Sequence, residues 1–181
     1  SKSLDNRVSV YILLESLKRL KDVEIPYDLH AVFTVQEEIG LRGAKTAAYA
    51  ISPDWGINLD VTIAYDLPGA QPHEIVTRLG KGTAIKVMDG SVVCDYRMVE
   101  YLKQTATQHN IPWQADILHA GGTDTAAVQM AANGAIAGGI SIPTRHIHQV
   151  IEMANIDDII GSIKLLKCCV EELDMYDWSF K

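Results

Sequence analysis

The residues best suited to chemistry are two adjacent acidic side chains, Glu37 and Glu38, at the end of an apolar run. Neighbouring side chains on a strand point to opposite faces, but the backbone turns where a strand ends, so both carboxylates can reach one cleft. The turn-forming sequence at residues 39–43 follows at once. One carboxylate could therefore bind a metal ion while the other moves protons.

Three more residues give this pair a setting: Asp5, Asp60 and His148 each stand where an expected element begins or ends. Ligand sites of open α/β sheets lie at such positions. Peptide hydrolysis needs an activated water, a stabiliser for the oxyanion and a group that carries a proton to the leaving amine, and two divalent ions can supply the first two. Carboxylates and an imidazole would hold the ions, and a carboxylate left free would act as general base.

Each acidic residue also has a simpler interpretation. Asp5 could cap the helix that follows it, as aspartate commonly does. Glu37 and Glu38 could form a solvated strand end, and Asp60 could be an ordinary turn residue. Because all of these coincidences would have to occur together, we favour the metal site.

A glycine-rich turn, Gly121-Gly122-Thr123-Asp124, separates an expected strand from an expected helix. It could be a plain turn whose Thr or Asp caps the helix. It could equally form a wall of a substrate pocket, with Gly121, Gly122 and Thr123 presenting backbone N–H groups to a peptide. Both interpretations remain open.

Arg145 lies close to His148 in sequence and could bind a substrate carboxylate, or pair with Asp124 or Glu152. His146 is the weaker histidine, and a supporting or surface role is the expectation for it rather than ligation. We therefore expect His148 to be the ligand, and a substrate-binding role for Arg145 is one of two alternatives.

Apolar spacing predicts how these residues are positioned. The expected helices are residues 7–21, 42–50, 95–109, 123–132 and 157–173. The expected strands are residues 27–35, 55–64, 84–87, 113–118 and 135–142, with 27–35 buried on both faces. A polar, aperiodic stretch at 66–81 predicts a surface loop or lid. This alternation predicts a three-layer α/β/α sandwich with a mostly parallel sheet.

The bulk properties restrict the class of protein. A length of 181 residues suits one domain, and the net charge of -7 with scattered basic residues argues against nucleic-acid binding. No apolar run approaches the roughly 18–20 residues that a membrane span needs. Three cysteines without paired spacing suggest reduced thiols in a cytoplasmic protein.

Five motifs, taken in order, carry a resemblance to a known family. They are Lys-Ser-Leu-Asp-Asn-Arg at 2–7, Gln-Glu-Glu-Ile-Gly-Leu-Arg-Gly-Ala at 36–44, Asn-Leu-Asp-Val-Thr at 58–62, Ala-Gly-Gly-Thr-Asp at 120–124 and Pro-Thr-Arg-His-Ile-His at 143–148. Through these the chain resembles the C-terminal half of the dinuclear metal aminopeptidases, which include glutamyl and deblocking aminopeptidases and the tetrahedral particles. Relatives have also carried endoglucanase names.

The resemblance implies a role for each residue. Asp5 would bridge two ions, Glu38 and Asp60 would bind opposite ions, and His148 would be the imidazole ligand. Glu37 would be the general base that activates a metal-bridged hydroxide. The ions would be zinc or cobalt, between which the sequence does not decide. The implied activity is removal of N-terminal residues from short peptides in the cytoplasm.

The resemblance also implies parts that this sequence does not contain. The family's remaining histidine ligand and its inserted dimerisation domain lie upstream of the position matching Ser1, so residues 1–181 would be an incomplete catalytic domain, inactive alone. The complete protein would form dimers, which could build dodecamers. The motif after the ligand histidine, residues 149–152, departs from the family's usual Ser-Pro-Val-Glu. The alternatives are a glycoside hydrolase, disfavoured by the scarcity of aromatic residues, and a non-catalytic binding or assembly module.

Overall fold

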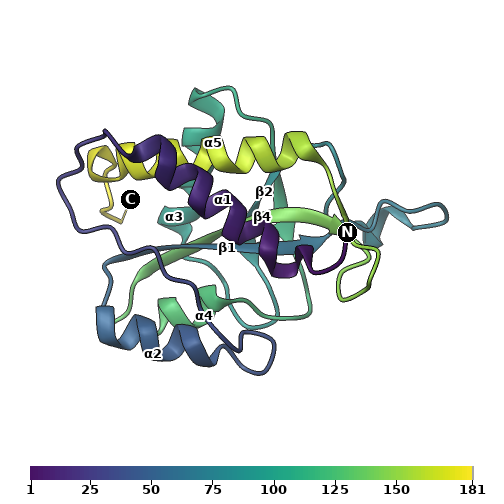
Figure 1. Ribbon diagram of the computed structural model, residues 1–181, viewed down its shortest axis with the longest axis horizontal. Helices are drawn as coiled ribbons and strands as arrows, with labels where there is room; N and C mark the ends of the chain where they lie inside the picture. Colours follow the sequence, from purple (N-terminus) through teal and green to yellow (C-terminus); the bar gives the residue numbers. More distant parts are fainter. Residues whose placement is uncertain (181) are drawn as a thin grey trace.

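A computed structural model describes residues 1–180 of the chain. Its helices are α1 (Leu4–Leu20), α2 (Arg42–Ile51), α3 (Tyr96–Gln108), α4 (Asp124–Gln129) and α5 (Ile156–Glu172), with short 3₁₀ helices η1 (Pro72–Glu74) and η2 (Leu173–Met175). Its strands are β1 (Trp55–Ile63), β2 (Thr83–Met88), β3 (Trp113–Ile117), β4 (Ile136–Arg145) and β5 (Met153–Ala154). Figure 1 shows these elements as one α/β unit.

The strands form one sheet in the order β1-β4-β2-β3, and the short β5 pairs with the end of β4. β1 runs parallel to β4, and β2 runs parallel to β3. The two pairs join through an antiparallel contact between β2 and β4. The expected α/β class with a mostly parallel sheet is confirmed.

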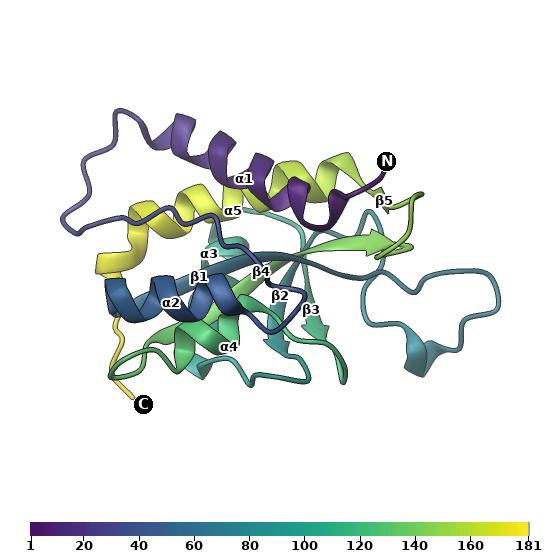
Figure 2. The same ribbon diagram turned by 60° about the horizontal axis from the view of Figure 1, so that its bottom comes forward.

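Helices cover both faces of the sheet, so the molecule has three layers (Figures 1 and 2). Helices α1, α3 and α5 pack on one face, and α2 and α4 on the other. Two neighbouring glycines of β4 show why both layers come so close. A Cβ added to Gly138 would lie 2.7 Å from Met98 Cγ of α3, and one added to Gly139 would lie 3.4 Å from Thr125 Oγ1 of α4.

Local sequence explains where the main helices begin and which side they bury. Asp95 caps α3 by accepting a hydrogen bond from Arg97 N, and Asn155 caps α5 by accepting one from Asp157 N. Apolar residues recur at helical spacing in α1, and Val8 and Ile12 are buried against the sheet layer. Strand β4 is buried along almost its whole length, as a central strand must be.

The expected strand at 27–35 is wrong. The segment is extended but belongs to no strand, and within residues 1–180 the backbone of residues 29–34 makes no hydrogen bond. It is not buried on both faces either, because the side chains of Val32, Phe33 and Val35 are 40%, 52% and 67% exposed. A strand needs a neighbour for its backbone groups, and the described residues place none beside this one.

Other boundaries differ less. Helix α1 begins at Leu4 rather than after residue 6, helix α4 ends at Gln129, and strand β4 runs on to Arg145. The region 66–81 is irregular apart from η1, as expected, and it projects from one end of the sheet in Figure 2. Asp158 anchors its far end by accepting hydrogen bonds from Gly80 N and Gly82 N, both at 2.8 Å.

Two simpler expectations can also be compared with the structure. Cys94, Cys168 and Cys169 are buried free thiols, as the absence of paired spacing predicted. Across residues 1–180, every helix falls short of the length and apolar character needed to cross a lipid bilayer.

Candidate metal centre

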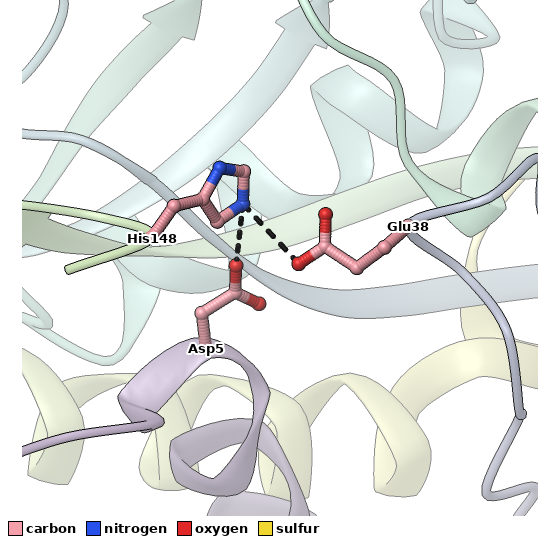
Figure 3. A group of neighbouring side chains, drawn as sticks. All are labelled: Asp5, Glu38 and His148. Carbon is pink, nitrogen blue, oxygen red and sulfur yellow. Dashed lines mark ion pairs between the residues drawn. The ribbon is translucent and has the colours of Figure 1, made fainter. Parts of the chain in front are cut away.

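Three of the candidate side chains converge at one end of the sheet: Asp5, Glu38 and His148 (Figure 3). Each offers one ligand atom, and these atoms all lie within 4.8 Å of one another. His148 Nε2 is 3.0 Å from Asp5 Oδ2 and 3.2 Å from Glu38 Oε1. The His148 and Glu38 side chains are 63% and 59% exposed, so the group is open to solvent.

These ligand atoms come from three separate parts of the chain. Asp5 lies in the first turn of α1, where its backbone departs from helical geometry. Glu38 lies in the turn that leads into α2, and His148 lies in the loop between β4 and β5. His148 has a φ of +63°, in the left-handed region that few side chains other than glycine favour.

The turn that carries Glu37 and Glu38 is fixed by the start of α2. Gly40 N and Leu41 N both donate to Glu37 O, at 3.0 and 2.9 Å, and Gly43 N donates to Val35 O at 2.9 Å. Gly43 must be glycine for this contact, because an added Cβ would lie 2.5 Å from Val35 N. The glycines of the motif thus turn the chain so that both carboxylates reach the sheet end.

The donor set suits a divalent cation. Burial, together with the neighbouring charge of Glu38, raises the pKa of Asp5 to about 6. Two carboxylates held against one imidazole repel each other, and a cation between them would offset that repulsion. Carboxylate oxygens with an imidazole nitrogen form the ligand set that zinc and cobalt accept in proteins. Asp5, Glu38 and His148 therefore fit such an ion.

Glu37 has the electrostatic character of a proton acceptor. Partial burial, together with the negative charges of Asp124, Glu38 and Asp5, raises its pKa to about 7. A carboxylate with a pKa near neutrality can take up a proton and release it again at physiological pH. The two neighbouring glutamates therefore differ in their surroundings. Glu38, like Asp5, contacts His148 Nε2, whereas Glu37 is not one of the three converging residues.

Asp60 sits deeper than the other carboxylates. It lies on β1, is 6% exposed, and its Oδ1 accepts a hydrogen bond from Val61 N at 2.9 Å. Burial raises its pKa well above the usual range, and the charge of Glu37 contributes next. Asp60 therefore shares the electrostatic surroundings of the centre, but it is not one of the three residues whose ligand atoms converge.

The glycine-rich turn at 121–124 makes contacts within the protein. The Thr123 hydroxyl is buried and donates to Asp89 Oδ2 at 2.9 Å, and Gly121 adopts a φ of +70°. Gly121 and Gly122 are exposed, so their backbone can be reached from solvent. Thr123 stands directly before α4 but makes no side-chain capping hydrogen bond, and Asp124 accepts from the Thr34 hydroxyl instead, so the expected Thr or Asp cap is wrong. Contact with a peptide stays a prediction.

Arg145 has neither of the partners expected for it within the protein. Its Nε donates to Asp66 Oδ1 at 2.6 Å, so the pairing with Asp124 or Glu152 is wrong. Asp66 also accepts a hydrogen bond from Leu79 N, and the pair therefore ties the projecting loop to the end of β4.

Sequence reasoning missed two residues of the centre, Asp124 and Glu152. Asp124 is 6% exposed, accepts a hydrogen bond from the Thr34 hydroxyl at 2.6 Å, and helps to raise the pKa of Glu37. Its position directly after Gly121-Gly122-Thr123 was the signal that could have identified it. Glu152 is 3% exposed and contacts the backbone beside two of the three converging residues.

Known proteins resemble this chain in sequence and in fold. Residues 1–165 match the family of M42 glutamyl aminopeptidases. A putative aminopeptidase of Acetivibrio thermocellus is 45% identical over 166 residues, which cover 92% of this chain and 49% of the relative. The solved TET aminopeptidase of a marine sediment archaeon of the Thaumarchaeota superposes with a TM-score of 0.92 at 37% identity, covering 95% of this chain and 48% of that one.

A second solved structure is the TET1 peptidase of Pyrococcus horikoshii, which can assemble into a tetrahedron or a large octahedral shell. It matches with a TM-score of 0.83 at 29% identity, covering 93% of this chain and 48% of that one. The chain thus spans about half the length of the relatives it matches. The family match covers most of the chain in motif order, and the chain belongs to the M42 glutamyl aminopeptidase family.

Proposed function

We propose that this chain carries most of the catalytic centre of a metal-dependent aminopeptidase that removes N-terminal residues from peptides. The observation that carries the proposal is the convergence of Asp5, Glu38 and His148, with Glu37 beside them at a pKa near 7. Family membership supports the aminopeptidase reaction. The geometry supports the proposal that these side chains perform it.

In this proposal Asp5, Glu38 and His148 hold one divalent ion, and Asp5 and Asp60 face a second. Zinc or cobalt, when bound, would polarise the scissile carbonyl and lower the pKa of water. Glu37 accepts the proton of the attacking water and delivers it to the leaving amine. Asp124 and burial keep the pKa of Glu37 high enough for both steps.

A long groove supports a second proposal, that residues 1–181 are one portion of a catalytic domain whose other portion lies outside this sequence. The groove has a volume of about 570 Å³ and lies between residues 28–34, β1, α1 and α2. Glu37 and Asp124 line it, so it reaches the candidate centre. Among the described residues β1 pairs with β4 alone, and residues 55–59 of β1 line the groove.

Both walls of this groove have backbone or side-chain polar groups left without partners. Residues 29–34 make no backbone hydrogen bond within the described chain. Buried polar atoms of Trp55, Asn58 and Asp124 also lack a hydrogen-bond partner there. Buried polar groups are almost always paired in folded proteins. We propose that an extended segment of the complete protein fills the groove and pairs with these groups.

The complete protein is also proposed to form a homo-oligomer that acts on short peptides. The support is the P. horikoshii relative, whose TET1 peptidase assembles into closed shells. The form we expect is a dimer-based assembly that can build a dodecamer. A cytoplasmic location is proposed from the three buried, unpaired thiols.

Elemental analysis and a peptidase assay test the proposed function together. The chain is co-expressed with the half of the A. thermocellus relative that it does not match, and hydrolysis of aminoacyl-p-nitroanilides is measured. We expect Glu37→Gln to lower the rate by about 10²–10⁴-fold, the usual range for loss of a general base, while the bound metal is retained. Glu24→Gln, at an exposed position, is the control.

The same experiment separates the alternatives. Hydrolysis of a β-glucan without peptide turnover would favour a glycoside hydrolase. No bound metal and no turnover would favour a binding or assembly module. Equal peptidase rates for wild type and Glu37→Gln would overturn the role of Glu37 while leaving the metal centre intact.

A further inference from the structure

We infer that Glu152 is a positioning residue, which fixes the distance between Asp5 and His148 by bonding to the backbone beside both. This inference rests on the proposed metal centre. It assigns to the loop between β4 and β5 the task of closing that centre.

The hydrogen bonds of Glu152 run to two segments that are far apart in sequence. Its Oε2 accepts from the backbone N–H groups of Leu4 and Asp5, the latter at 3.3 Å. Its Oε1 accepts from His148 N at 3.1 Å. One carboxylate therefore joins the start of α1 to the loop after β4, across 147 residues of sequence.

The Glu152 side chain is buried, which restricts its hydrogen bonds to these backbone donors. Glu152 is 3% exposed and sits directly before β5, whose pairing with β4 brings the loop back on itself. A buried carboxylate is costly unless its oxygens are hydrogen-bonded, and here backbone donors bond both oxygens. The side chain is thus committed to these donors and is not one of the three converging residues.

The conformation of His148 shows what the bond at Oε1 holds. His148 has a φ of +63°, a left-handed backbone state that most residues avoid and that persists only where surrounding contacts require it. Glu152 bonds the N–H of this same residue. Loss of that bond frees the loop to leave the left-handed state and to carry the imidazole away from Asp5.

Charge and reach can be separated by two substitutions. Glu152→Gln keeps the length of the side chain but leaves only one acceptor oxygen, so it cannot serve both segments. Glu152→Asp keeps the charge and both oxygens but is one methylene shorter, so it cannot reach both. A purely electrostatic role predicts that only the Gln variant weakens cation binding, whereas a positioning role predicts that both variants do.

The test is titration of the 181-residue chain with Co²⁺ by calorimetry and by visible absorption. We expect both variants to bind Co²⁺ about 10–100-fold more weakly, the range found when supporting partners of metal ligands are removed, with an altered absorption band. Glu171→Gln, a partly buried glutamate paired with Lys167 on α5, is the matched control and should bind like wild type. Wild-type affinity in Glu152→Asp overturns the inference.

Amide hydrogen exchange in the metal-free chain gives a second measurement that does not depend on metal. We expect the amides of Leu4, Asp5 and His148 to exchange at least about 10-fold faster in both variants, while those of α5 keep their rates. Unchanged exchange at these three amides overturns the positioning role. If wild type binds no Co²⁺ although the exchange result is as expected, the proposed metal function fails and the functional part of the inference fails with it.

Discussion

The sheet has a paired side around the central strand β4 and an open side at the edge strand β1, and the two differ in how completely their backbone is hydrogen-bonded. On one side, β4 has β1 and β2 as neighbours and β5 at its end, and helices α3 and α5 cover it. On the other side, β1 lines the groove, and residues 29–34, which line the same groove, make no backbone hydrogen bond within residues 1–180. The candidate centre lies where the two sides meet, with His148 from the paired side and Glu37 and Glu38 from the open side.

This difference indicates how the centre is held. Asp5 and His148 are fixed by contacts within residues 1–180, through Glu152 and the β4–β5 pairing. Glu37 and Glu38 depend on the short turn into α2, because residues 29–34, which lead to that turn, make no backbone hydrogen bond within residues 1–180. One half of the centre is therefore built by this chain alone, and the other half would gain rigidity from a segment that fills the groove.

Hydrogen exchange should show the largest contrast between the two sides. Amides of 29–34 have no hydrogen-bond acceptor among the described residues, whereas those of β4 are paired and buried. We expect protection factors in the middle of β4 to exceed those of 29–34 by about 10⁴-fold or more, since core strands open only by global unfolding. Strong protection at 29–34 in the isolated chain would break the comparison.

A pair of alanine substitutions should show the next largest difference between β4 and the open segment at 28–34. Ile140 in β4 is fully buried, and Ile140→Ala should lower the free energy of unfolding by about 2–5 kcal/mol through the cavity it leaves. Phe33 on the open segment is half exposed, and Phe33→Ala should cost less than about 1 kcal/mol. Urea unfolding of both variants measures the two values, and equal losses would show that residues 28–34 belong to the core.

The pH dependence of the metal-free chain should give a smaller effect. Folding raises the pKa of Glu37 to about 7 and of Asp5 to about 6, from ordinary values of 4.5 and 3.8. The folded chain then binds protons more tightly than the unfolded chain, so this stability is complete below about pH 4 and is lost as the pH rises through 6 and 7. Asp66 and Asp95, whose pKa values are lowered, titrate below this window.

We therefore expect the free energy of unfolding to be lower at pH 8 than at pH 5, by roughly 1–2 kcal/mol after allowance for solvent screening. Saturating Co²⁺ should abolish this fall, because a bound cation stabilises the ionised carboxylates. Urea midpoints at the two pH values, with and without Co²⁺, provide the measurement. Stability that rises between pH 5 and pH 8 in the metal-free chain would contradict the crowding of carboxylates at the centre.

Local pattern predicted most of the fold because most elements bury an apolar face that is visible in short stretches. Helix α5 and strand β1 are examples, since the spacing of their own side chains is sufficient. The absence of a strand at 27–35 was not predictable in the same way. The apolar residues of this segment fit a strand, but strand formation depends on a neighbour that the described chain does not provide.

The centre shows the same limit. Asp5, Glu38 and His148 were predictable from residue type and motif order, and the structure brings them together. The contacts of Glu152 and Arg145 were not, because they join a loop to α1 and to Asp66 across long stretches of sequence. Which carboxylate bonds to which backbone is decided only when these elements pack.

The central claim is that Asp5, Glu38 and His148 form one cation site, and Co²⁺ titration of His148→Ala beside His146→Ala tests it most directly. Both histidines lie in the same exposed loop with similar positive φ values, so the pair is closely matched. We predict that wild type and His146→Ala bind one Co²⁺ with equal affinity and that His148→Ala binds at least about 100-fold more weakly. Equal affinity in all three proteins would contradict the account.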